Sequence, residues 1–244
     1  MTHNDIYIKY MIEYDKANVT SSYPALTEYE IATILDKAYN ALIAQKITGN
    51  NIRRTGFESD IKSISDLQPL IKEYKTYDSN FSMTGNSNTD FGYSDVTNSQ
   101  WIKLPTDFLY FVNCRMKVKK DANNRISTPI KLLTHQMAEK FFETPYNKPW
   151  IKQPICYIED NKMFIVYDSQ IVHDSQYGSP DLLIRLSYIK TPNSFINNLK
   201  DSGTKFECND TIAEELISLA ITFALENVES PRLNSKLNTK GLEA

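Results

Sequence analysis

Two long amphipathic helical patterns, one near each end of the chain, flank a strand-rich middle, and this arrangement constrains the fold most. The clearer pattern lies between Thr27 and Gly49. Thr27 with Glu30 fits a capping box at the start of a helix, and Gly49 fits the left-handed residue that ends one. Apolar residues recur between them at helical spacing and predict one buried stripe: Ile31, Ile34, Leu35, Ala38 and Leu42.

The second long pattern begins near Asp210 or Thr211, where Thr211 and Glu214 fit another capping box. Pro231 ends this pattern, because the residue before a proline disfavours helical backbone. The residues that follow have few apolar side chains and no period, so we expect an extended C-terminal tail. The apolar face of the predicted helix comprises Ile212, Leu216, Leu219, Ala220, Phe223 and Ala224.

Two shorter helical patterns complete the N-terminal part of the chain. The first spans about 4–16, with Thr2 and Asp5 as its capping box. The second starts near Phe57 and is interrupted by Pro69, which cannot donate a backbone hydrogen bond. Its predicted apolar side consists of Ile61, Ile64 and Leu67.

The middle of the chain is typical of β structure. Two apolar runs, 155–159 and 163–167, flank the turn pair Asp160-Asn161, which predicts a β-hairpin. Apolar and polar residues alternate over 182–189, and further strands are expected within 101–118.

A long polar segment precedes these strands. Serine, asparagine, aspartate, threonine and glycine dominate 76–99, which predicts a loop. Loops of that length inside a compact protein are usually functional or disordered. A short helix is expected later, over 134–143. The loop carries isolated apolar residues that indicate ordering against a partner: Phe81, Met83, Phe91 and Tyr93.

Together these patterns predict an α+β protein with a β region inserted into a helical bundle. The bundle would combine 1–75 with 205–230. The inserted region would be antiparallel and span 101–204, after the polar loop at 76–100. The extended tail would occupy 231–244.

The composition argues against several functional classes. The chain has a formal net charge of −3, and its short basic runs lack the clustering of a protein that reads nucleic acid. No apolar run reaches the length of a membrane span, and the three cysteines share no metal spacing. We therefore expect no membrane, metal or cofactor, and buried thiols in a reducing cytoplasm. The 15 tyrosines suit surfaces that a partner covers, although an AT-rich genome would also enrich tyrosine.

Catalytic residue types occur only in isolated groups. His135 and Glu139 lie one helical turn apart without a further metal ligand. The run 173–175 has the sequence His-Asp-Ser, but no nucleophile elbow accompanies it. We expect both groups to be surface residues of a helix and a loop.

Carboxylates at the ends of the predicted hairpin define an alternative function. Glu159, Asp160 and Asp168, with His173, could bind a divalent cation in a metal-dependent hydrolase or nuclease. Aspartate is also an ordinary turn residue, and we favour that interpretation.

The C-terminal tail is the candidate binding segment. Leu233 and Leu237 are isolated apolar residues on a polar strip and follow Arg232 directly or closely. Such a segment can order on the surface of a partner, although a frayed terminus is the simpler reading.

Three stretches resemble the head-to-tail connector proteins, also called adaptor or ring proteins, of short-tailed bacteriophages. They are the Leu-Pro-x-Asp-Phe step into a strand within 103–111, the hairpin over 155–167, and the closing helix over 212–233 with its Glu-Ser-Pro-Arg-Leu ending. The chain is most similar to the ring proteins of crAss-like phages. The resemblance covers most of the chain, but the polar loop has no counterpart in it.

The resemblance implies a structural virion protein at the head-to-tail junction, made in the cytoplasm of the host bacterium. About twelve copies would form a closed ring, in which one face of each copy meets a different face of the next. The ring would join the portal protein to adjacent ring or tail proteins, and genomic DNA would pass through its lumen without sequence readout. Arg232, Leu233 and Leu237 would dock on an adjacent ring, and no catalytic residue is implied.

Overall fold

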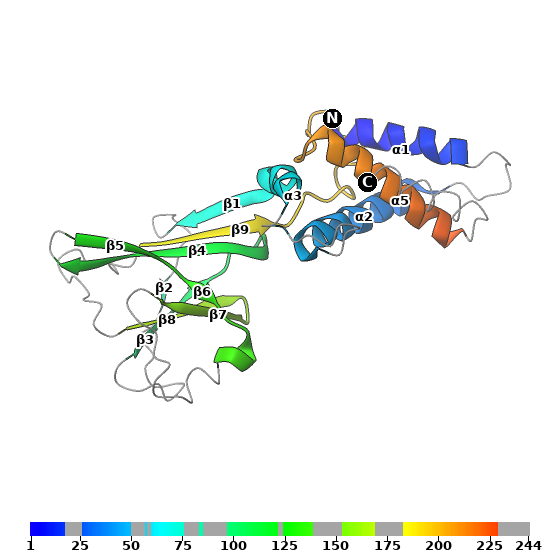
Figure 1. Ribbon diagram of the computed structural model, residues 1–244. Helices are drawn as coiled ribbons and strands as arrows, with labels where there is room; N and C mark the ends of the chain where they lie inside the picture. The colour runs from blue at the N-terminus through cyan, green and yellow to red at the C-terminus, as the bar shows by residue number, and fades with distance from the viewer. Residues whose placement is uncertain are drawn as a thin grey trace. The chain divides into compact units, whose positions relative to one another are not determined.

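The computed structural model describes residues 1–17, 26–49, 57, 60–75, 83–84, 97–121, 124–138, 153–168 and 183–228. These residues fall into two compact units (Figure 1). The helical unit is Met1–Leu70 together with the described residues from Pro192 onward, and the β unit is Ile71–Thr191. Helices and mainly antiparallel sheets both occur, so the predicted α+β class is confirmed.

Helix α5 (Asp210–Asn227) is the centre of the helical unit. Helices α1 (His3–Ala17) and α2 (Glu28–Thr48) both pack against it, while α3 (Ile61–Leu67) packs against α2 and continues into η2 (Gln68–Leu70). Because neighbours cover α5 on more than one side, its buried residues form a wide band rather than a narrow stripe: Ile212, Ala213, Leu216, Ile217, Leu219, Ala220, Ile221, Thr222, Ala224 and Leu225.

The caps of α2 confirm the sequence prediction. The backbone N–H of Thr27 donates to the Glu30 carboxylate at 2.7 Å, and the Glu30 N–H donates back to the Thr27 hydroxyl at 3.3 Å. Gly49 ends the helix with φ 72°, a conformation in which a Cβ is unfavourable. The predicted box at the start of α5 is wrong. Asn209 is the N-cap there, and the Glu214 carboxylate forms an ion pair with Lys9 of α1 instead.

Helix α3 is present but begins at Ile61 rather than near Phe57, and its predicted apolar side is not buried as a whole. Leu67 is buried, whereas Ile61 is 87% exposed and Ile64 is 39% exposed. The buried side of α3 instead contains Ser63, Asp66 and Leu67, and Asp66 pairs there with Lys46 of α2.

The irregular segment before α5 is fixed to the helices by polar and aromatic contacts. The Asp36 carboxylate of α2 accepts hydrogen bonds from the Phe195 N–H at 2.7 Å and from the Ser194 hydroxyl at 2.5 Å. His3 is buried, and its ring lies 4.7 Å from that of Phe195 and 6.2 Å from that of Phe206. The start of the chain is thereby held against residues two hundred positions away.

One sheet of the β unit has four antiparallel strands in the order β1-β9-β4-β5. They are β1 (Ile71–Lys75), β9 (Leu183–Lys190), β4 (Phe108–Asp121) and β5 (Asn124–Pro129). The alternating pattern over 182–189 is confirmed as β9. Strands β1 and β5 were not anticipated, since their sequences are short and rich in polar residues.

The other sheet has the order β2-β3-β8-β7-β6. Its strands are β2 (Met83–Thr84), β3 (Thr97–Lys103), β8 (Lys162–Asp168), β7 (Ile155–Glu159) and β6 (Lys131–Leu132). Strands β7 and β8 confirm the predicted hairpin, whereas β6 pairs in parallel with β7, so the region is not wholly antiparallel.

Two sequence predictions can be compared with the structure only in part: the loop over 76–99 and the helix over 134–143. Strand β2 and the start of β3 lie within 76–99, which was predicted to be loop throughout, because both strands pair at the edge of the sheet. The rest of that segment lies outside the described residues. Of the helix predicted over 134–143, residues 135–138 are helical, Thr134 precedes the helix, and 139–143 lie outside the described residues.

The two sheets share one core. Side chains from both inner faces form a single cluster: Tyr74, Ile102, Leu104, Cys114, Met116, Ile130, Cys156, Met163, Ile165, Tyr167, Ile184, Leu186 and Tyr188. The five-stranded sheet is covered on its other face as well, where Leu133 and Ala138 pack on Ile155, Tyr157 and Val166.

An ion cluster with a buried Lys46–Asp66 pair joins three helices of the helical unit. Lys46 of α2 donates to Asp66 of α3 at 2.7 Å and lies 2.9 Å from the Glu215 carboxylate of α5. Lys62 completes the cluster, 3.1 Å from Glu215. Burial lowers the pKa of Lys46, but the hydrogen bonds to Asp66 and Glu215 outweigh it, and the net pKa lies above its usual value. The charges in this cluster therefore depend on one another.

Replacing Lys46 with methionine should destabilise the helical unit strongly. The substitution keeps most of the side-chain volume but leaves the buried Asp66 carboxylate without its partner. We expect a loss of about 3 kcal/mol in the free energy of unfolding, measured by urea denaturation. Lys200→Met is the matched control, because its pair with Glu28 is more than half exposed on both sides and should change stability little. Equal losses in the two variants would contradict a buried role for Lys46.

Candidate assembly surfaces

The hairpin turn accounts for two of the carboxylates considered as metal ligands. Asp160 has φ 46° and Asn161 has φ 58°, the left-handed pair that a tight two-residue β-hairpin turn requires. The Asp160 side chain is 88% exposed, with Lys162 at 3.9 Å, and Glu159 is exposed beside it. Their position follows from turn geometry, so it gives no support for a cation site.

The described residues do not form the cation site considered for a hydrolase. Within the ranges that the structure describes, no group of three or more histidine, cysteine, aspartate or glutamate side chains could hold a metal ion. His173 and the side chain of Asp168 lie outside those ranges. His135 lies with its ring 6.1 Å from that of Tyr157, and its predicted partner Glu139 is outside the described residues.

The cysteines are packing residues. Cys114, Cys156 and Cys208 are all buried as free thiols. Burial raises the pKa of Cys156 to about 12, which keeps the thiol protonated and unreactive. The prediction of buried thiols is confirmed.

Two exposed apolar ridges stand out on the helical unit. The α1 ridge consists of Ile8 and Ile12, which are 46% and 48% exposed and lie one helical turn apart. The α3 ridge consists of Ile61 and Ile64. Exposed large apolar side chains that recur on one helix face are typical of surfaces that a partner covers.

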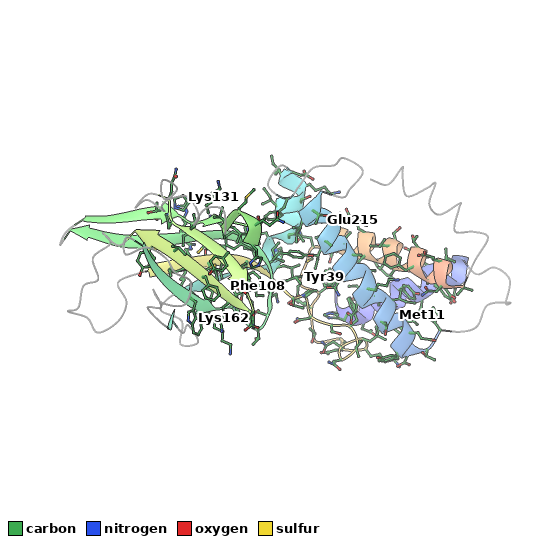
Figure 2. The ribbon with its side chains drawn as sticks, turned by 90° about the horizontal axis from the view of Figure 1, so that it is seen from below. Met11, Tyr39, Phe108, Lys131, Lys162 and Glu215 are labelled. Atoms are coloured by element: carbon green, nitrogen blue, oxygen red, sulfur yellow. The ribbon has the colours of Figure 1, made fainter. Side chains whose placement is uncertain are left out.

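The two ridges belong to helices on different sides of α5. Lys9 of α1 pairs with Glu214, whereas Lys62 of α3 pairs with Glu215. Consecutive residues of a helix point about 100° apart, so α1 and α3 approach α5 from different directions. In Figure 2, Met11 on α1 and Glu215 on α5 mark these separate parts of the unit. One rigid unit therefore presents two distinct apolar surfaces.

The α1 ridge could have been found from the sequence, but the α3 ridge could not. Ile8 and Ile12 share helical spacing with each other and lie opposite the buried residues Ile6 and Tyr10. The exposure of α3 depends on the ion cluster, which spacing does not reveal. The predicted tail residues Arg232, Leu233 and Leu237 lie outside the described residues.

Exposed apolar ridges on a helical unit are typical of proteins that bind other chains in an assembly. Comparison with protein families agrees: residues 1–227 match the phage tail ring protein 3/4 family, and the chain belongs to this family of crAss-like phage ring proteins. The resemblance seen in the sequence is confirmed. No curated protein matches the chain.

Family membership makes this chain a structural ring protein of the bacteriophage virion. A metal-dependent hydrolase finds no support in the family or in the described site residues. None of the helices in the described ranges is both long and apolar enough to cross a membrane.

Substitutions at Asn161 should separate a turn from a cation site. Asn161→Ala places a Cβ-bearing residue without turn-forming amide at a positive φ, and we expect it to lower the free energy of unfolding by about 1 kcal/mol. Asn161→Gly should preserve or raise stability, since glycine is favoured there. Urea unfolding of both variants measures the difference. A divalent cation that raises the unfolding midpoint, and that loses this effect in Asp160→Asn, would contradict the turn interpretation.

Proposed function

We propose that the chain is one subunit of a closed ring at the head-to-tail junction, which joins the portal protein to the tail and surrounds the DNA exit channel. About twelve copies would close the ring, each contributing the same pair of unlike faces. The presence of two separate apolar ridges on one helical unit is the observation that carries this proposal. Family membership supports it by placing the chain among tail ring proteins.

A cyclic ring needs two complementary and different surfaces on each copy. The α1 ridge and the α3 ridge meet this need, because contact between the α1 ridge of one copy and the α3 ridge of the next repeats without using either ridge twice. Burying one isoleucine side chain contributes about 1.5–3 kcal/mol before the cost of association, so four of them favour contact without forcing it in the free monomer.

Charges beside the ridges favour the same pairing. The exposed residues Asp5 and Asp15 lie on the same face of α1 as its ridge, whereas Lys62 lies next to Ile61 on α3 and is 52% exposed. Opposite charges at the rim of an apolar contact help to fix its register.

The C-terminal tail provides a second contact in this proposal. Leu233 and Leu237 would insert into an adjacent ring, with Arg232 at the point where the tail leaves the helical unit. The helical unit, Met1–Leu70 with the residues from Pro192 onward, would face neighbouring copies and the portal protein, and the β unit, Ile71–Thr191, would complete the subunit.

Charged substitutions on the α1 ridge should prevent assembly while preserving the fold. We expect Ile8→Asp with Ile12→Asp to remain a folded monomer by circular dichroism and to be absent from purified particles by mass spectrometry. Ile196→Asp is the control, because this isoleucine is also exposed, at 44%, in the same unit but outside both ridges. Normal incorporation of the α1 variant, or equal loss of both variants, would overturn the ridge contact.

Truncation after Pro231 tests the tail separately. We expect the shortened chain to fold with an unchanged melting temperature, since the described core ends before this point. It should still fail to enter particles, as scored by complementation of an amber mutant phage. Particles that contain the shortened chain at normal stoichiometry would show that the tail is not needed for docking.

A further inference from the structure

One face of the four-stranded sheet is open and basic. Along β4 the buried residues Cys114 and Met116 alternate with the exposed residues Asn113, Arg115 and Lys117. The buried set belongs to the core between the sheets, so the exposed set points to the opposite face. The five-stranded sheet is covered on both faces, whereas the described part of this sheet leaves its outer face uncovered.

Three cations form one row across neighbouring strands of this face. Lys75 of β1 lies opposite Arg185 of β9, and Arg185 lies opposite Arg115 of β4. Like charges that lie directly opposite one another destabilise a sheet. A row of this kind therefore requires compensation by negative charge.

The described residues supply only part of that compensation. The Glu73 carboxylate pairs with Arg185 and lies 3.1 Å from Lys75. These pairs hold the pKa of Glu73 below its usual value, first through the hydrogen bond from Arg185. Among the described residues, no carboxylate pairs with Arg115 or Lys117.

Hydrogen-bond donors converge beside the row. A hollow of about 210 Å³ is lined by Asn113, Arg115, Arg185 and Ser187. Asn113 and Ser187 are themselves cross-strand partners, so two adjacent rows contribute to the hollow. Each of these side chains can donate to an anion, and the planar guanidinium groups suit phosphate oxygens in particular.

Formal charge is distributed unevenly between the two units. The β unit holds 15 lysines and arginines against 13 aspartates and glutamates, a net charge of +2. The remainder of the chain holds 12 against 17, a net charge of −5. Among the described residues of the outer face, Arg115 and Lys117 add positive charge that no carboxylate pairs with, on a chain that is negative as a whole.

We propose that this face binds the phosphodiester backbone of duplex DNA. Arg115 and Arg185 would contact phosphate oxygens, Lys117 would add charge along β4, and Asn113 and Ser187 would donate hydrogen bonds. Contacts of this kind do not depend on base sequence, because every phosphate is alike. The inference rests on the proposed ring around the exit channel. In that ring, phosphate contacts of the β unit would slow the passage of DNA.

DNA binding by the full-length protein tests this directly. Fluorescence anisotropy of a labelled duplex is followed across a salt titration, in which each phosphate contact adds about 0.9 to the slope of log K against log salt. We expect Arg115→Gln with Lys117→Gln to reduce that slope by about two. Lys103→Gln with Lys131→Gln removes the same charge from exposed positions on the other sheet and should reduce it much less.

The outcomes separate this inference from the proposed function. Circular dichroism melting confirms that both double variants are folded. Undetectable DNA binding at low salt, or equal loss in the two double variants, overturns the inference. A third outcome is that the protein does not bind DNA but self-associates in a salt-sensitive way, and that only the Arg115 and Lys117 variant loses this self-association. The basic face would then bind an acidic surface of another copy, and the inference would be overturned. Incorporation into particles is scored separately. A wild-type DNA affinity in the Arg115 and Lys117 variant would therefore refute the DNA-binding inference but leave the proposed ring function untouched.

Discussion

The helical unit depends on α5 being covered from several directions at once. Its wide band of buried residues leaves little surface for solvent, and two adjacent carboxylates, Glu214 and Glu215, attach α1 on one side and α2 with α3 on another. The Glu215 contacts are partly buried, and the hydrogen bonds from Lys46 and Lys62 keep its pKa below the usual value although burial raises it. Charge pairing thus acts together with the burial of Leu67 in the orientation of α3, which leaves Ile61 and Ile64 exposed.

The dependence of the helical unit on contacts between residues far apart in the sequence explains which features the sequence could predict. Helix α2 was predictable in its caps and its buried stripe because both signals are local, within Thr27 to Gly49. The hairpin at Asp160 was predictable for the same reason. The burial of α3 was not, since it follows from Lys46 and from Glu215, which lies far along the chain.

The candidate surfaces also combine features that local sequence signals predict with features that only tertiary packing determines. Helical spacing reveals that α1 is apolar on two faces, but only the packing of α5 decides that Ile6 is buried and Ile8 is not. The basic sheet face required strand register, because Lys75, Arg115 and Arg185 become neighbours only when three strands pair. The family could be identified from short sequence motifs, and the family match over residues 1–227 confirms it.

The β unit begins and ends on adjacent strands. Ile71, the first residue of β1, lies opposite Ile189 in β9, and the chain leaves the unit just after, at Thr191. The entry and exit of this excursion are therefore held together by the sheet's own hydrogen bonds. Insertions or deletions elsewhere in the β unit can therefore leave the spacing between its first and last residues unchanged, so this unit can vary in length without disturbing the helical unit's own packing.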